Sequence, residues 1–108
     1  MPHYLIQGSY TTDAWAKMTR KPEDREKLYR GLIEGAGGKL HAFYFAFGEK
    51  DVVAILEAPD AVTAAALSMA VAAPGHVRSI TTTPLLTVAE GMAAMKKAGG
   101  MTYQGPKA

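Results

Sequence analysis

The chain has 108 residues, of which 48% are hydrophobic and 20% are charged, and its formal net charge at pH 7 is +2. This length predicts a single domain with one modest core. The basic residues are scattered, so they do not form the dense stripe that binds nucleic acid. Because the chain has no cysteine, disulfides, thiolate metal sites and cysteine nucleophiles are excluded.

No segment reads as a targeting or membrane-spanning sequence. The N-terminus lacks a basic region followed by an apolar run, so we expect no signal peptide. The apolar stretch 53–75 is interrupted by Glu57, Pro59 and Asp60, which makes it unsuitable for crossing a bilayer. We therefore expect a cytoplasmic protein with neither nucleic-acid nor membrane partners.

The first predicted elements are a strand and a short helix. Residues His3 to Tyr10 have the aromatic and aliphatic content of a strand. Thr11 to Asp13 then provide capping side chains for a short helix that contains Trp15 and Met18. Pro22 ends this helix, because the residue before a proline is disfavoured in the helical region.

The main helix is predicted from Pro22 to about Ala36. Proline suits the first helical position, and the acidic residues that follow it favour the positive end of the helix dipole. The apolar stripe that should face the core consists of Leu28, Leu32, Ile33 and Ala36.

A hairpin from Leu40 to Asp60 organises the rest of the chain. Its first arm is rich in aromatic residues, Gly48 to Asp51 form the turn, and the second arm is the apolar run 52–56. A hairpin with one solvated face should alternate between apolar and polar residues, so this run predicts a sheet covered on both faces. Helices would cover one face and a second copy of the chain would cover the other.

The second half should contain a helix, an edge strand and a further helix. The helix from Asp60 to Ala73 is rich in alanine, and small residues allow close approach to the sheet. The strand from His76 to Leu86 is placed at an edge, because Pro84 cannot donate a hydrogen bond to a neighbour. A capping box at Thr87 begins the last helix, which runs to about Lys97. The side of the alanine-rich helix predicted to face the sheet consists of Val62, Ala65, Ala66, Met69 and Ala73.

This order of elements predicts an α+β fold of the ferredoxin-like βαββαβ type with an added C-terminal helix. Both main helices would lie on one face of a four-stranded antiparallel sheet. We expect residues 1–98 to form the domain and residues 99–108 to form a mobile tail. The uncovered face predicts a homo-oligomer, at least a dimer, of the dimeric α+β barrel type.

The sequence resembles the GYD domain family, small bacterial and archaeal proteins of largely unknown function. The resemblance spans roughly residues 4 to 88 and implies a ferredoxin-like fold without an established chemistry. Lys50 stands where the motif that names the family has a tyrosine, so no role of that tyrosine carries over. The shared features are Gly37-Gly38, Phe43-Tyr44, Gly48-Glu49-x-Asp51, Glu57-Ala58-Pro59-Asp60 and Gly75-x-Val77-Arg78.

The candidate binding site depends on the pairing of the two hairpin arms. If Phe47 lies opposite Val52, then Phe43, Phe45 and Phe47 share one face and pack under the helices. Tyr44 and Glu57 then point into the uncovered face. There they form either a ligand site or a buried polar pair at a dimer interface.

Two further residues complete the candidate site. Arg78, on the last strand, could join Tyr44 and Glu57 and hold an anionic ligand, or it could be an exposed arginine on an edge strand. Asp51 closes the hairpin turn, where its carboxylate can accept bonds from backbone N–H groups, and a ligand-binding role is the alternative.

The sequence predicts no metal site and no cofactor. His3, His41 and His76 are the only histidines, and none of their spacings is typical of a metal site. A metal site would need these residues to converge in space. There is no GxGxxG or GxxxxGK[ST] sequence for a nucleotide.

Three kinds of protein fit this pattern. The first is a small-molecule-binding or accessory protein with a cavity between the sheet and its partner. The second is a cofactor-independent monooxygenase or isomerase in which Tyr44 or His41 is the acid or base, which rests on analogy of fold alone. The third is a structural assembly subunit, for which a flat, filled interface is expected.

Overall fold

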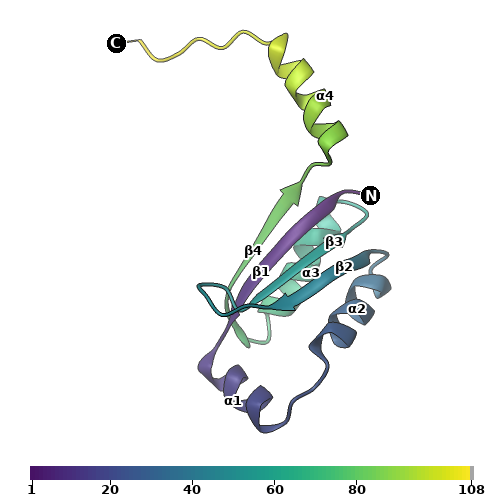
Figure 1. Cartoon of the computed structure of the whole chain (residues 1–108), viewed down its shortest axis with the longest axis vertical. Coiled ribbons are helices and arrows are strands. Elements are labelled where there is room, and N and C mark those ends of the chain that lie inside the picture. Colours follow the sequence, from purple (N-terminus) through teal and green to yellow (C-terminus); the bar gives the residue numbers. More distant parts are fainter. Residues whose placement is uncertain (108) are drawn as a thin grey trace.

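A four-stranded antiparallel sheet in the order β2-β3-β1-β4 is the frame of the molecule (Figure 1). The computed structural model describes residues 1–107. In that range the elements are β1 (His3–Tyr10), α1 (Thr12–Arg20), α2 (Arg25–Gly35), β2 (Lys39–Phe45), β3 (Val52–Glu57), α3 (Ala61–Ala72), β4 (Val77–Leu85) and α4 (Val88–Gly99).

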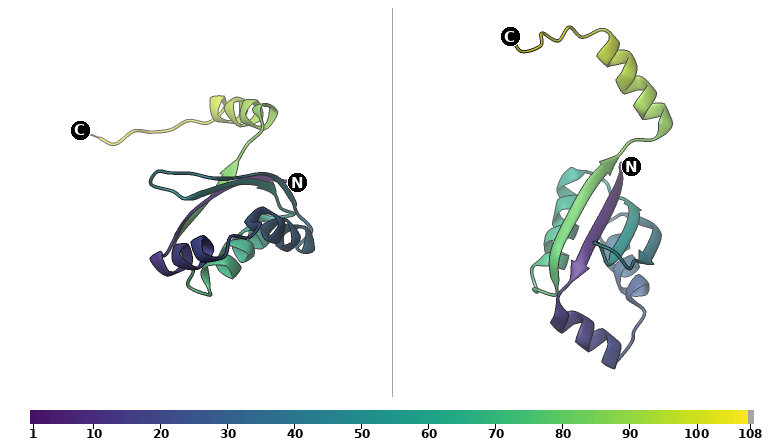
Figure 2. Two further views of the ribbon diagram at one scale, coloured as in Figure 1. Left: turned by 60° about the horizontal axis from the view of Figure 1, so that its bottom comes forward. Right: turned by 60° about the vertical axis from the view of Figure 1, so that its left-hand side comes forward.

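The arrangement of these elements confirms the predicted ferredoxin-like α+β fold. The chain runs βαββαβ with two helices in the first connection, and β1 pairs with both β3 and β4. Helices α1, α2 and α3 lie on one side of the sheet, and α4 lies on the other side (Figure 2). The face of the sheet away from α1 to α3 is called the open face below.

The core lies between the sheet and helices α2 and α3. Leu56 and Ala58 are 1% and 0% exposed, and Ala64 and Leu67 of α3 are buried above them. The buried residues of this cluster are Tyr4, Ile33, Leu40, Ala54, Leu56, Ala58, Ala64 and Leu67. Burying a leucine or isoleucine side chain contributes about 1.5–3 kcal/mol to folding, so this layer is the main source of stability.

Helix α2 begins at Arg25 and not at Pro22, where the sequence predicted its start. Asp24 is the N-cap, and its carboxylate accepts a hydrogen bond from the backbone N–H of Lys27. The predicted apolar stripe is correct for Ile33, which is 4% exposed, and wrong for Leu28 and Leu32, which are 53% and 41% exposed. Tyr29 packs against the core instead, because its ring stacks on Phe43.

Helix α3 begins at the predicted N-cap, Asp60, but faces the sheet with a different side. The buried residues are Ala64 and Leu67, whereas Val62 and Met69 are 79% and 68% exposed. The expected set of Val62, Ala65, Ala66, Met69 and Ala73 lies on the exposed side. Because the helix is apolar all round, its periodicity does not distinguish the two sides.

The hairpin is confirmed, but its pairing is shifted by two residues. Val52 lies opposite Phe45 and not opposite Phe47. The loop is longer than expected because Glu49 and Asp51 bond to β1: the Glu49 carbonyl accepts from the Ser9 hydroxyl, and the Asp51 N–H donates to the Gly8 carbonyl. A shift by two keeps each side chain on its predicted face.

The loop also changes the position of the aromatic residues. Phe43 packs against the core on the helical side, as predicted. Phe45 is 49% exposed and contacts Trp15 and Phe43, and Phe47 at the loop is fully exposed. The expectation that all three phenylalanines pack under the helices is therefore wrong for Phe47 and only partly correct for Phe45.

Helix α4 projects beyond the end of β4 (Figure 1). Its capping box is confirmed: Thr87 accepts from the Glu90 N–H, and Glu90 accepts from the Thr87 N–H. The radius of gyration is 17.4 Å, against about 13 Å for a compact chain of this length, because α4 and the following segment extend outwards. Residues 101–107 are exposed without helix or strand; position 108 of the predicted tail lies outside the described residues.

Candidate functional site

The structure places Tyr44, Glu57 and Arg78 apart from one another. Tyr44 lies opposite Val53 on the open face and is 68% exposed. Glu57 is four residues further along β3, which corresponds to about 13 Å. Arg78 sits in a bulge near the Tyr10 end of β1, whereas Glu57 pairs with the other end, about 20 Å away.

Asp51 connects the hairpin loop to the start of α1. Its carboxylate accepts a bond of 2.9 Å from the Tyr10 N–H and one of 3.3 Å from the Trp15 indole N–H. The sequence predicted an acceptor for the N–H groups of its own turn, but the donors come from β1 and α1. Both bonds tie the loop to a small second cluster formed by Tyr10, Ala14 and Val52.

The open face joins apolar side chains to a polar cluster at one end. Leu5 and Val53 are half-buried, and Ile55 is 37% exposed. These residues alternate along β1 and β3 with the buried residues of the core. No helix covers them in the part of the chain that the structure describes (Figure 2).

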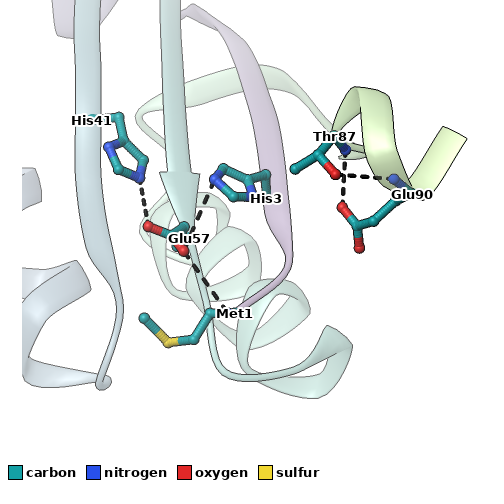
Figure 3. A network of polar contacts seen from close by, with 6 residues as sticks. All are labelled: Met1, His3, His41, Glu57, Thr87 and Glu90. Carbon is teal, nitrogen blue, oxygen red and sulfur yellow. Dashed lines mark hydrogen bonds and ion pairs between the residues drawn. The ribbon is translucent and has the colours of Figure 1, made fainter.

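The polar cluster is centred on Glu57. The Glu57 carboxylate is 2.6 Å from Nε2 of His41 and 3.9 Å from Nε2 of His3, and the Met1 amine is 3.8 Å away. The two imidazole rings are stacked, with centroids 5.6 Å apart and planes at 15°. Figure 3 shows both rings turned towards the one carboxylate.

Pairing and a bulge together bring these residues to one place. His3 lies directly opposite Glu57, which puts both on the open face. In β2, Leu40 pairs with Leu56 and Ala42 pairs with Ile55, so His41 is the extra residue of a bulge. A bulge redirects a side chain, and this one gives the His41 ring access to Glu57.

The charges around the cluster favour ionised carboxylates. The hydrogen bond from His41, followed by the nearby His3, holds the pKa of Glu57 below its ordinary value of 4.5. Glu90 lies at the start of α4, on the His3 side of the cluster (Figure 3). Its pKa is also lowered, first by the Thr87 N–H and then, more weakly, by His3 and the Met1 amine.

The cavities of the molecule lie elsewhere. An apolar cavity of about 40 Å³ lies between the sheet and α2 and α3, and a groove of about 200 Å³ lies beside it, lined by Tyr10, Arg25 and Leu32 among others. Burial raises the pKa of the Tyr10 phenol in this groove. Tyr44, Glu57 and Arg78 line neither this cavity nor this groove.

A second uncovered surface is the apolar side of α4, called the α4 stripe here. It consists of Val88, Met92 and Met95, which are 83%, 55% and 72% exposed and lie at helical spacing. Within the described chain, no residue of α4 is buried. No helix in residues 1–107 has the length and apolar character needed to cross a membrane.

The sequence did not predict that two of the histidines, His3 and His41, meet at Glu57. The predicted strands already put His3 and Glu57 in the chain's two central strands. The register between these strands pairs His3 with Glu57, and the content of the strands alone does not give that register. The bulge at His41 has no glycine or proline to mark it, so nothing in the sequence signals that contact.

The fold and the uncovered sheet define a ferredoxin-like α+β protein, and comparison with known proteins gives its family. The profile of the GYD domain matches residues 4–95. The chain therefore belongs to the GYD domain family, as its sequence motifs suggested.

Two individual proteins are similar to this chain. One, from Thermus thermophilus, is named glutamine synthetase and cystathionine beta-lyase binding protein. It is 28% identical over 81 residues, which cover 75% of this chain and 85% of that protein. The crystal structure of MtbAldR aligns with 80% of this chain at 15% identity and a TM-score of 0.58. The chain spans about half the length of that structure, 53%, and the likeness concerns the fold alone.

Proposed function

We propose that this chain is an accessory protein that binds another protein, and that the α4 stripe is the main contact surface. The observation that carries the proposal is the exposure of the stripe residues Val88, Met92 and Met95 on a helix with no buried residue among those described. Methionine side chains adapt to irregular partner surfaces. An isolated helix shorter than about 12–15 residues is marginal in water, so contact with a partner would stabilise α4.

The similar protein from Thermus thermophilus suggests the kind of partner. Its name states that it binds glutamine synthetase and cystathionine beta-lyase. We infer that the partner of this chain is a metabolic enzyme, with these two enzymes as the first to test. Helix-in-groove recognition, in which an apolar helix face enters a hydrophobic groove, is the binding mode that fits the stripe.

Binding of purified enzymes tests this proposal. The two enzymes from the source organism would be titrated with the full-length chain in a calorimeter. Met92→Glu places a charge in the stripe and should weaken binding more than tenfold, which is about 1.4 kcal/mol. Ala93→Glu lies on the opposite side of α4 and serves as the control. Equal affinity of both variants would rule out the stripe, and lack of binding to either enzyme would remove the proposed partners.

The proposal includes self-association through the open face. Leu5, Val53 and Ile55 would be covered if the sheets of two copies packed face to face, as in a dimeric α+β barrel. Light scattering at micromolar concentration should give at least twice the chain mass of 11.5 kDa. Ile55→Glu should shift the chain to monomer, whereas Val62→Glu on the outer side of α3 should not. A monomeric parent chain would contradict this part of the proposal.

A further inference from the structure

Three side chains with metal-binding atoms meet at the end of the open face. One ligand atom each from His3, His41 and Glu57 lies within 4.8 Å of the others. The three residues belong to three neighbouring strands, β1, β2 and β3, so the sheet itself holds them in register. From this geometry we propose that His3, His41 and Glu57 form a binding site for a divalent first-row transition metal ion of the zinc type.

The distances among these atoms fit an ion after a small adjustment. Zinc lies about 2.0–2.2 Å from imidazole nitrogen and carboxylate oxygen, so tetrahedral ligand atoms are about 3.4 Å apart. The pair formed by His41 Nε2 and Glu57 Oε2, at 2.6 Å, is closer than this, and the pair formed by His3 Nε2 and Glu57 Oε1, at 3.9 Å, is wider. Rotation of the three side chains by about 1 Å at their tips would even out these separations.

The chemistry of the three ligands selects the class of ion. Imidazole binds zinc, copper, iron and nickel well, and one carboxylate adds the charge that divalent ions favour. Calcium and magnesium prefer sites made only of oxygen ligands, so they would bind weakly here. Three protein ligands leave a coordination position open for water or for an outside ligand.

A bound ion would account for the orientation of both histidines towards one carboxylate. The His41 bulge interrupts regular pairing of β2 with β3 and gives up a backbone contact at that position. The rings of His3 and His41 each direct one nitrogen towards a different oxygen of the Glu57 carboxylate (Figure 3). An ion between them would bind both nitrogens at once. The carboxylate alone lies 2.6 Å from the His41 nitrogen but 3.9 Å from the His3 nitrogen.

The neighbouring charges set the conditions for binding. The Met1 amine, 3.8 Å from Glu57, competes with an incoming cation, and Glu90 offsets this charge from the α4 side.

Titration of the untagged full chain with zinc chloride, after treatment with a chelator, tests the site. Calorimetry should give one ion per chain, and cobalt should give the visible absorption of a low-coordinate site. His41→Ala and Glu57→Gln should each weaken binding by at least about tenfold. His76→Ala removes the third histidine, which lies outside the cluster, and should leave affinity unchanged.

The outcomes separate a metal site from a simple ion-pair network. Circular dichroism of each variant establishes that it is folded; His41 is exposed, so its replacement should not disturb the core. If zinc shows no saturable binding up to about 100 μM, the proposal is wrong. Equal binding by the parent chain and His41→Ala would overturn it as well, because the ion would then occupy another place.

Discussion

The two faces of the sheet share the same strands but differ in the burial and polarity of their side chains. On the helical side, Leu56 and Ala58 are buried in a layer that includes Ala64 and Leu67 of α3. On the open face, the adjacent residue Ile55 is 37% exposed, and Glu57 has two histidines as neighbours instead of apolar side chains. Stability therefore depends on one face, and the other is available for binding.

Replacement of adjacent residues on β3 is the strongest test of this difference. Leu56→Ala should lower the free energy of unfolding by about 2–5 kcal/mol, because it leaves a cavity in the core. Ile55→Ala should cost about 1 kcal/mol or less, since its side chain already contacts solvent. Urea denaturation at low protein concentration would measure both. Similar losses for the two variants would mean that the open face is also covered.

Two glycines give a second test, with effects of opposite sign. A Cβ at Gly38 would lie 2.5 Å from the Glu57 carbonyl oxygen, so Gly38→Ala should destabilise the chain by about 1–3 kcal/mol. A Cβ at Gly31, on α2, meets nothing within 4 Å in the described structure, so Gly31→Ala should stabilise by about 0.5–1 kcal/mol. Thermal unfolding of both would show whether the strand end is as crowded as we describe.

The carboxylate of Asp51 makes the side-chain bonds that hold the loop between β2 and β3. Asp51→Ala leaves the Tyr10 N–H and the Trp15 indole N–H without their acceptor, which should cost about 1–2 kcal/mol. Glu49→Ala is the control, because Glu49 bonds to Ser9 only through its backbone carbonyl. Denaturant unfolding should separate the two variants, and an equal effect would assign the result to loop composition and not to the carboxylate.

The smallest expected effect concerns pH and the open face. Because the pKa of Glu57 is below 4.5 in the folded chain, the unfolded chain binds the proton more tightly. The ionised carboxylate therefore contributes stability above pH 4.5, and this contribution disappears as the pH falls through the folded pKa. Glu57→Gln should be less stable than the parent chain near neutral pH and nearly equal to it at acid pH. A difference in stability between Glu57→Gln and the parent chain that is equal at both pH values would contradict this expectation.

The fold could be predicted because capping residues and a proline in the sequence indicate the helix starts and an edge strand. Thr11, Asp60 and Thr87 are all N-caps in the structure, and Pro84 lies in an edge strand as expected. The buried side of α3 could not be predicted, because an all-apolar helix has no polar side to orient it. Packing against β4, where Ser68 bonds to Thr82, decides the orientation of α3 instead.

The candidate site could be predicted only in part. The face assignment of Tyr44 and Glu57 followed from strand alternation and survives the shift in pairing. Their separation did not follow, because it depends on bonds from the loop to β1, which connect residues about 40 positions apart in sequence. The ligand-binding roles of Tyr44, Glu57, Arg78 and Asp51 stay predictions, as does the absence of a cofactor.

The irregular outer strands have a consequence for behaviour at high concentration. β4 contains Pro84, which has no N–H to offer, and a bulge at Arg78, while β2 at the other edge has the His41 bulge. Edge-to-edge addition of strands needs a long regular row of free N–H and C=O groups, and such interruptions block it. Growth into open-ended β-stacked polymers is therefore disfavoured at both edges of the sheet.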